Sequence, residues 1–248
     1  MGERSVSVVV PALNEAENIR PLVDEILRAL GDDPALEIVY VDDGSDDASP
    51  AIFEALAREL SPRFVCVRHQ TRCGQSTGVR TGVRQARNPW IVTLDADGQN
   101  DPADIPALLA CLFAEADPHN TLVAGWRQKR QDTWLKRFSS RYANRIRAAL
   151  LKDNTPDTGC GLKVFSRDLF LSLPYFSHMH RFLPALTLRA GGRVVSVPVH
   201  HRPRTLGVSK YGFFNRFWVG IVDILGVMWL QRRARVPVIS GIQGRGYE

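Results

Sequence analysis

The sequence lacks the motifs that mark the commonest nucleotide and metal sites. No GxxxxGK(S/T) segment is present and no GxGxxG follows the first apolar run, which disfavours a P-loop NTPase and a nicotinamide-dependent enzyme. Cysteine is scarce, and the four that occur, Cys66, Cys73, Cys111 and Cys160, form no CxxC pair. This spacing argues against a zinc site or a disulfide framework and favours reduced thiols in a cytoplasmic compartment.

Long apolar runs, internal repeats and low-complexity linkers are missing as well. The first apolar run, at residues 5–10, is too short for the core of a signal peptide. Residues 213–230 are apolar except for Asn215, Arg216 and Asp223, and these interruptions disfavour a transmembrane span of about 20 residues. We therefore expect one domain at residues 1–212, a helix at 213–235 and a tail at 236–248.

The charge that is present is mostly positive. Lys and Arg number 32 against 26 Asp and Glu, which gives a net charge of +6 at pH 7. Such an excess implies an anionic partner, and charge alone leaves open whether this is nucleic acid, a phosphate-bearing substrate or an acidic membrane surface.

Apolar runs alternate with amphipathic stretches in the first half of the chain. The runs lie at residues 5–10, 37–41, 64–68 and 90–94. This alternation predicts an α/β fold with a mostly parallel central sheet flanked by helices. Farther along, the pattern predicts a helix at 102–116, a strand at 121–124, a basic helix at 133–151 and a strand at 193–198.

Capping and breaking residues set the bounds of the first helices. Asn14 can cap a helix that ends at Gly31. Ser49 followed by Pro50 is typical of a cap and the first helical position of the next helix.

Three glycines, Gly74, Gly78 and Gly82, fall four residues apart. On a helix they would form a narrow ridge that another backbone can approach. Because the segment is not an apolar span, we interpret the ridge as packing against the sheet and not as a membrane dimerisation face.

Polar residues follow three of the predicted strands, at the edge where ligands bind in parallel α/β sheets. These segments contain Pro11, Asn14 and Glu15 after the first run, Asp42 and Asp43 after the second, and Asp95, Ala96, Asp97 and Gln99 after the fourth. Each cluster alone is explained by a cap, a turn or a solvated loop, but three clusters at one edge indicate a ligand site. The Asp-x-Asp pattern suits Mg²⁺ or Mn²⁺ bridging carboxylates to a diphosphate, because these cations prefer oxygen ligands.

Taken in order, the motifs resemble those of the family 2 glycosyltransferases, which have the GT-A fold. They lie at residues 11–15, 41–45, 72–76, 95–102, 157–163, 180–186 and 204–211. The last three are similar to those of the dolichol-phosphate mannose synthase branch, and the resemblance spans about residues 5–233. Residues 72–75 and 125–127 depart from the family pattern, which leaves the sugar donor open.

The resemblance implies a role for each motif, with a nucleotide-sugar half at residues 1–100 and an acceptor half at 101–212. It implies that the nucleotide sugar contacts Pro11, Asn14, Glu15, Asp42, Asp43, Asp95, Ala96, Asp97, Gln99, Arg204 and Lys210, with the metal ion held by Asp95, Asp97 and Gln99. It implies that the acceptor phosphate contacts Arg127, Arg137 and Ser140, with Ser139 an alternative to Ser140. We expect Asp95, Asp97, Arg127 and Arg204 to carry the catalysis, and Asp157 either faces the donor sugar or caps a turn.

These roles predict inverting transfer of a hexose, with mannose from GDP-mannose implied by the resemblance, to a polyprenyl or dolichyl phosphate. A phosphate monoester has a second pKa near 6, so it attacks at neutral pH without a general base. The alternatives are a UDP-sugar donor or a saccharide hydroxyl acceptor. A nucleic-acid-binding protein that uses the basic helix is a more remote alternative, because the strand-end carboxylates would repel phosphates.

The apolar stretch near the C-terminus predicts an amphipathic helix at the membrane interface. The side chains expected in the lipid boundary are Phe214, Phe217, Trp218, Ile221, Leu225, Met228 and Trp229. Arg232, Arg233 and Arg235 would meet anionic headgroups, which predicts a protein bound peripherally to the cytoplasmic face of a membrane. The alternative is a helix packed on this domain or on a second copy of the chain in a homo-oligomer.

Overall fold

The computed structural model describes residues 4–31, 33, 35–127, 147, 150–153, 155–203 and 213–235, and for residues 213–219 the backbone alone. The predictions for Arg137, Ser140, Arg204 and Lys210, for most of the basic helix and for the tail at 236–248 lie outside the described residues.

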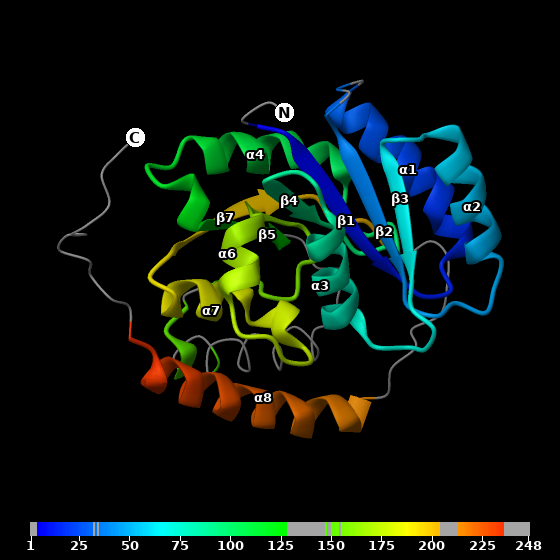
Figure 1. Ribbon diagram of the computed structural model, residues 1–248. Helices are drawn as coiled ribbons and strands as arrows, with labels where there is room; N and C mark the ends of the chain where they lie inside the picture. The colour runs from blue at the N-terminus through cyan, green and yellow to red at the C-terminus, as the bar shows by residue number, and fades with distance from the viewer. Residues whose placement is uncertain are drawn as a thin grey trace, which may run out of the picture.

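A seven-stranded sheet forms the centre of the described part of the chain (Figure 1). Its strands are β1 (Val6–Ala12), β2 (Glu37–Asp42), β3 (Phe64–Arg68), β4 (Trp90–Thr93), β5 (Thr121–Arg127), β6 (Lys163–Ser166) and β7 (Arg193–Val199). The spatial order is β3-β2-β1-β4-β6-β5-β7, with β6 antiparallel to β4 and β5 and the other pairs parallel. The predicted mostly parallel sheet is confirmed, whereas β6 was not predicted.

Helices cover both faces of the sheet. They are α1 (Ala16–Leu30), α2 (Ser49–Glu59), α3 (Gln75–Gln85), α4 (Ile105–Phe113), α6 (Arg167–Ser172), α7 (Leu183–Arg189) and α8 (Phe213–Arg233), with short 3₁₀ turns η1 (Pro102–Asp104), η2 (Pro118–Asn120) and η3 (Met179–Arg181). One core cluster joins the sheet to α1, α2 and α4, and the other joins it to α3, α6, α7 and α8. The domain therefore has three layers, and α8 runs along its outer edge (Figure 1).

The first strand shows why the apolar runs are so uniform. Val8, Val9 and Val10 are fully buried, yet Val8 and Val10 belong to one core cluster and Val9 to the other. Because alternate side chains of a strand point to opposite faces, a strand covered by helices on both sides must be apolar at every position.

The structure corrects two predicted helix caps and the extent of one predicted helix. Asn14 does not cap α1: the N-cap is Glu15, and Asn14 adopts a left-handed φ of 52° with its side chain bonded to Asp46. Ser49 is the first residue of α2 and not its cap. The predicted helix at 102–116 is divided into η1 and α4 and ends at Phe113.

Two of the three spaced glycines pack against the sheet as predicted. A Cβ on Gly78 would lie 2.9 Å from the Pro11 side chain, and one on Gly82 would overlap Val9. Gly74 differs, because a Cβ there would meet no atom within 4 Å. It is the N-cap of α3 and has a left-handed φ of 90°, a conformation that favours glycine. Only the α3 residues that face β1 therefore require glycine for space.

The C-terminal helix α8 packs one side on the domain. Val227 is buried, and Met228, which we expected in the lipid boundary, packs on the core as well. Val222, Leu225 and Trp229 are exposed. No helix among the described residues is long and apolar enough to cross a membrane.

Three polar contacts hold α8 in place. Asp223 pairs with His178 at 3.1 Å, next to η3. The guanidinium of Arg189 donates to the Leu230 carbonyl at 2.9 Å, and the Gln231 amide donates to the Leu151 carbonyl at 2.8 Å. The helix is therefore bonded to three separate segments of the C-terminal half.

Candidate functional site

A cavity of about 380 Å³ opens at the carboxyl ends of β1 and β4. The strand order reverses here: β2 and β3 follow β1 on one side of it, and β4 lies on the other side. Ligands bind at such switch points in α/β folds. The cavity is lined by Pro11, Gln75, Val79, Thr93, Leu94, Asp95, Arg127, Gly159, Cys160, Gly161, Lys163, His180, Arg181 and Leu183.

Asp95 presents its carboxylate to this cavity from the end of β4. Gln75 donates to its Oδ1 at 2.7 Å. Burial raises the pKa of Asp95 to about 6, with a further rise from the negative charge of Asp97, while Lys163 and Arg127 act in the opposite direction. A buried carboxylate beside a second carboxylate is a donor set that a hard divalent cation fits, because the cation offsets their negative charge.

The chain from Gly159 to Gly161 lies directly against Asp95. Thr93 donates from Oγ1 to the Gly161 carbonyl at 2.7 Å, which seats this segment beside β4. A Cβ on Gly161 would overlap the Asp95 carboxylate. Glycine at this position therefore leaves the space that the carboxylate occupies.

The loop that carries Asp97 and Gln99 is fixed from its far side by Arg202. The Arg202 backbone N–H donates to the Gln99 carbonyl at 3.0 Å, and Asn100 forms a β-bridge with His201. The Arg202 guanidinium lies 2.8 Å from Glu25 and 2.8 Å from Asp101. Asp97 and Gln99 do not line the cavity, but they belong to the same fixed loop as Asp95.

The loops after β1 and β2 are bonded to each other. The Asn14 side chain exchanges hydrogen bonds with Asp46, at 2.6 Å to its carboxylate and 3.0 Å from its backbone N–H. The Asn14 backbone donates to the Ser45 hydroxyl at 2.9 Å, and Glu15 accepts from Asn18 at 2.8 Å. The predicted residues Asn14 and Glu15 are therefore brought to the loop that follows Asp42 and Asp43.

Asp42 and Asp43 are buried, and backbone donors hold their carboxylates. Asp42 accepts from the Ser45 N–H at 2.8 Å and pairs with Arg68 at 3.3 Å. Asp43 accepts from the N–H groups of Cys73 at 2.8 Å and Gly74 at 2.7 Å. The loop after β2 is thereby attached to the N-terminus of α3, next to Gln75.

On the opposite side of the cavity, Arg127 at the end of β5 forms a bidentate pair with Asp157. The two N–H···O distances are 2.6 and 2.8 Å, and both side chains are largely buried. Asp157 also accepts from the Gly159 N–H at 3.2 Å, which is the turn contact that one of its two predicted roles requires.

Sequence reasoning gave no role to Gln75, Lys163, His180 or Arg181, which all line the cavity. Burial lowers the pKa of the Lys163 ammonium, which donates to the Cys160 carbonyl. Burial, reinforced by the Arg181 charge, lowers the pKa of His180 well below its ordinary value, and its Nδ1 lies 2.7 Å from the Ser76 hydroxyl. The signal was present, because these residues lie within or directly beside the quoted motifs.

Of the predicted site residues, the structure brings Pro11, Asp95 and Arg127 to the cavity wall. Ala96 is buried beside Asp95, and the other described ones lie in the adjoining loops. The predicted residues Asn14, Glu15, Asp42, Asp43, Asp97 and Gln99 do not line the cavity, and Asn14 and Asp42 bond to protein groups.

Comparison with known proteins gives consistent relatives. A model of glycosyl transferase family 2 matches residues 7–173. The chain is 34% identical over 247 residues to the dodecaprenyl-phosphate galacturonate synthase of Rhizobium johnstonii, covering 97% of this chain and 72% of that protein. It is 36% identical over 213 residues to the undecaprenyl-phosphate 4-deoxy-4-formamido-L-arabinose transferase of an Enterobacter species, covering 85% of this chain and 63% of that one.

Solved structures share the fold at lower identity. The glucosyl-3-phosphoglycerate synthase of Mycobacterium tuberculosis with UDP superposes with a TM-score of 0.65 at 19% identity, covering 95% of this chain and 82% of that one. A mannosyltransferase of Pyrobaculum calidifontis with GDP-Man and Mn²⁺ gives a TM-score of 0.65 at 24% identity, covering 94% of this chain and 66% of that one.

Proposed function

The chain belongs to glycosyltransferase family 2 and has the GT-A fold, and from this premise we propose that it transfers a sugar from a nucleoside diphosphate to a polyprenyl phosphate. The observation that carries the proposal is the composition of one cavity. Its lining combines the Asp95 carboxylate with the cationic side chains Arg127, Lys163 and Arg181. Two relatives named for polyprenyl-phosphate acceptors support the choice of a lipid phosphate.

In this proposal the strand-end carboxylates serve the donor. A divalent cation, Mg²⁺ or Mn²⁺, would be held by Asp95, Asp97 and Gln99, and when bound it supplies positive charge for the departing diphosphate. The Mn²⁺ in the Pyrobaculum neighbour supports this choice of cation class. Pro11, Asn14, Glu15, Asp42, Asp43 and Ala96 would surround the nucleotide, with Arg204 and Lys210 closing over it.

The cationic side chains of the cavity serve the acceptor. Arg127, together with Arg137 and Ser140, would bind the lipid phosphate and reduce its repulsion from the diphosphate. A phosphate oxygen forms the new bond to the anomeric carbon, and the electron pair of the breaking bond leaves on the diphosphate. The acceptor is already ionised at neutral pH, so no side chain has to remove a proton and the anomeric configuration inverts.

The sugar and the base remain to be assigned, with GDP-mannose first and UDP-sugars as the alternative. The test incubates the full chain with a short polyprenyl phosphate and an oligosaccharide acceptor, Mn²⁺ and a panel of radiolabelled GDP- and UDP-sugars. We expect label from one donor to enter the lipid phase and to require the cation. Label that enters only an oligosaccharide acceptor would overturn the lipid-phosphate proposal, and retention of the donor's anomeric configuration would overturn direct displacement.

We also propose that α8 rests on the cytoplasmic face of a membrane. Val222, Leu225 and Trp229 recur at spacings of three and four residues on its exposed side, and Arg232 and Arg233 follow them. Exposed apolar groups beside cations suit an anionic lipid surface. In liposome flotation, Leu225→Ser with Trp229→Ser should weaken binding, whereas the matched change of exposed Leu171 on α6 should not.

A further inference from the structure

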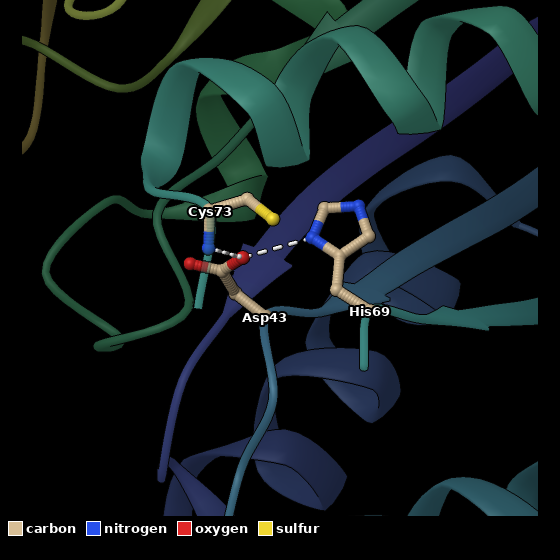
Figure 2. Close-up of side chains that lie close together, drawn as sticks. All are labelled: Asp43, His69 and Cys73. Atoms are coloured by element: carbon tan, nitrogen blue, oxygen red, sulfur yellow. Dashed lines mark hydrogen bonds and ion pairs between the residues drawn. The ribbon is translucent and has the colours of Figure 1, made fainter. Parts of the chain in front are cut away.

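Asp43, His69 and Cys73 form a cluster beside the cavity, on the loops after β2 and β3 and before α3 (Figure 2). One carboxylate oxygen, one ring nitrogen and the thiol sulfur lie within 4.8 Å of one another. Figure 2 shows the imidazole and the thiol on the same side of the Asp43 carboxylate. None of the roles assigned above uses His69 or Cys73.

We propose that this cluster binds a transition-metal cation of the zinc class, at a site distinct from the oxygen ligands Asp95, Asp97 and Gln99. The ligands would be the Cys73 thiolate, His69 Nδ1 and Asp43 Oδ1, with the fourth position open to water. Sulfur and imidazole ligands select zinc-class cations over Mg²⁺ and Mn²⁺, which prefer oxygen. The spacing of the cysteines along the chain did not reveal this cluster, because two of its three ligands are not cysteine.

The groups behind these ligands already hold them in place. His69 Nε2 lies 3.0 Å from the Thr81 hydroxyl, and metal-bound histidines use the second ring nitrogen in this way. The Asp43 carboxylate accepts the N–H groups of Cys73 and Gly74, which fix its orientation. The side chains of His69 and Asp43 are 13% and 7% exposed, while Cys73 is exposed and leaves an entry path.

Metal binding moves two protons, one on the His69 ring and one from the Cys73 thiol. His69 Nδ1 lies 2.8 Å from Asp43 Oδ1, and because a carboxylate only accepts, Nδ1 carries the ring proton before metal binds. When the cation binds Nδ1, the single proton of the neutral ring moves to Nε2, where the Thr81 hydroxyl accepts it at 3.0 Å. The Cys73 thiol, which donates to the Thr71 carbonyl at 3.2 Å, loses its proton to solvent.

The cluster also connects to the proposed active site. Asp43 is one of the proposed nucleotide contacts, and Gly74 leads into Gln75, which bonds Asp95 at 2.7 Å. A zinc-class ion on Asp43 should therefore oppose nucleotide binding, a consequence that rests on the proposed function. The metal site itself does not rest on it.

Cobalt(II) is the probe that reports the ligands directly, because a cobalt–thiolate bond absorbs in the near ultraviolet. With excess Mg²⁺ present, Co²⁺ titrated into the full chain should give this absorption at one equivalent, and Zn²⁺ should abolish it. Cys73→Ser should remove the band, His69→Gln should weaken Co²⁺ affinity by at least tenfold, and Thr81→Val should weaken it by roughly 10- to 100-fold. Cys111→Ser is the matched control and should leave the titration unchanged.

Absence of the band, its survival in Cys73→Ser, or an unchanged affinity in His69→Gln would each overturn the site. Circular dichroism in the absence of cobalt confirms that each variant folds. A second arm measures nucleotide affinity with and without Zn²⁺. Zn²⁺ should lower the nucleotide affinity of the wild type and leave that of Cys73→Ser unchanged. If no nucleotide binds at all, the proposed function fails while the cobalt result still decides the metal site.

Discussion

Two regions that adjoin the cavity, the β1–β2 side and the β5–β6 side, hold their charges by different means. On the side of β1 and β2, the carboxylates of Asp42 and Asp43 accept hydrogen bonds from backbone N–H groups. On the side of β5 and β6, Arg127 and Asp157 hold each other. A backbone donor persists when a side chain is replaced, whereas a buried ion pair leaves an uncompensated charge when one partner is removed. The second side should therefore be the less tolerant of substitution.

The largest expected effect tests that difference directly. Arg127→Met leaves the Asp157 carboxylate buried without its partner and should lower the free energy of unfolding by about 3–5 kcal/mol in urea denaturation. The double variant Arg127→Met with Asp157→Leu should recover much of this loss, because both charges are gone. Arg68→Met is the comparison on the β1–β2 side: Asp42 keeps the Ser45 N–H donor when Arg68 is removed, so this variant should lose less stability. Equal losses in the two single variants would remove the distinction between the sides.

A smaller effect, on turnover and not on stability, is expected in the loop that carries Asp97 and Gln99. Asp97→Ala should lower cation-dependent turnover by roughly 10²- to 10³-fold, the scale of losing one charge contact to a leaving group. Asp24→Ala on the exposed side of α1 serves as the control for loss of a carboxylate. Full activity of Asp97→Ala at saturating Mn²⁺ would contradict the assignment of this residue to the cation.

Gly161→Ala should have an intermediate effect, because its Cβ would overlap the Asp95 carboxylate. We expect a loss of about 1–3 kcal/mol in unfolding free energy and weaker Mn²⁺ activation. Gly226→Ala on α8, where no atom lies within 4 Å of the new Cβ, should instead leave stability equal or raise it by roughly 0.5–1 kcal/mol. If Gly161→Ala changed neither stability nor Mn²⁺ activation, residues 159–161 would be able to shift away from the Asp95 carboxylate at little cost in free energy.

The last expected effect concerns pH. The pKa of Asp95 is raised by burial and by Asp97 to about 6, above its ordinary value of 3.8. The folded state therefore favours the protonated acid, and its stabilising contribution is lost as pH rises from about 4 through 6. Without divalent cation, wild type should lose stability relative to Asp95→Asn across this window, by at most about 1.4 kcal/mol per pH unit, and no further above it. A difference that grows above pH 7 would point to another group.

The same two sides differ in how far the sequence predicts them. The strands β1, β2 and β4 could be located because each is an apolar run broken by polar residues, and parallel strands bring those breaks to one edge. Strand β6 could not, since it has four residues and begins with the charged Lys163. The Arg127–Asp157 pair joins residues 30 apart, and no local pattern records which strand register brings them together. Asn14 was misjudged because a cap and a left-handed loop residue favour the same side chain.

The contact between α8 and the domain has a mechanical consequence. His178, which pairs with Asp223 of α8, is two residues from His180 in the cavity wall. Arg189 and Gln231 join the same helix to α7 and to Leu151. A displacement of α8 relative to the domain would therefore also move η3, the turn that carries His180 and Arg181 into the cavity wall.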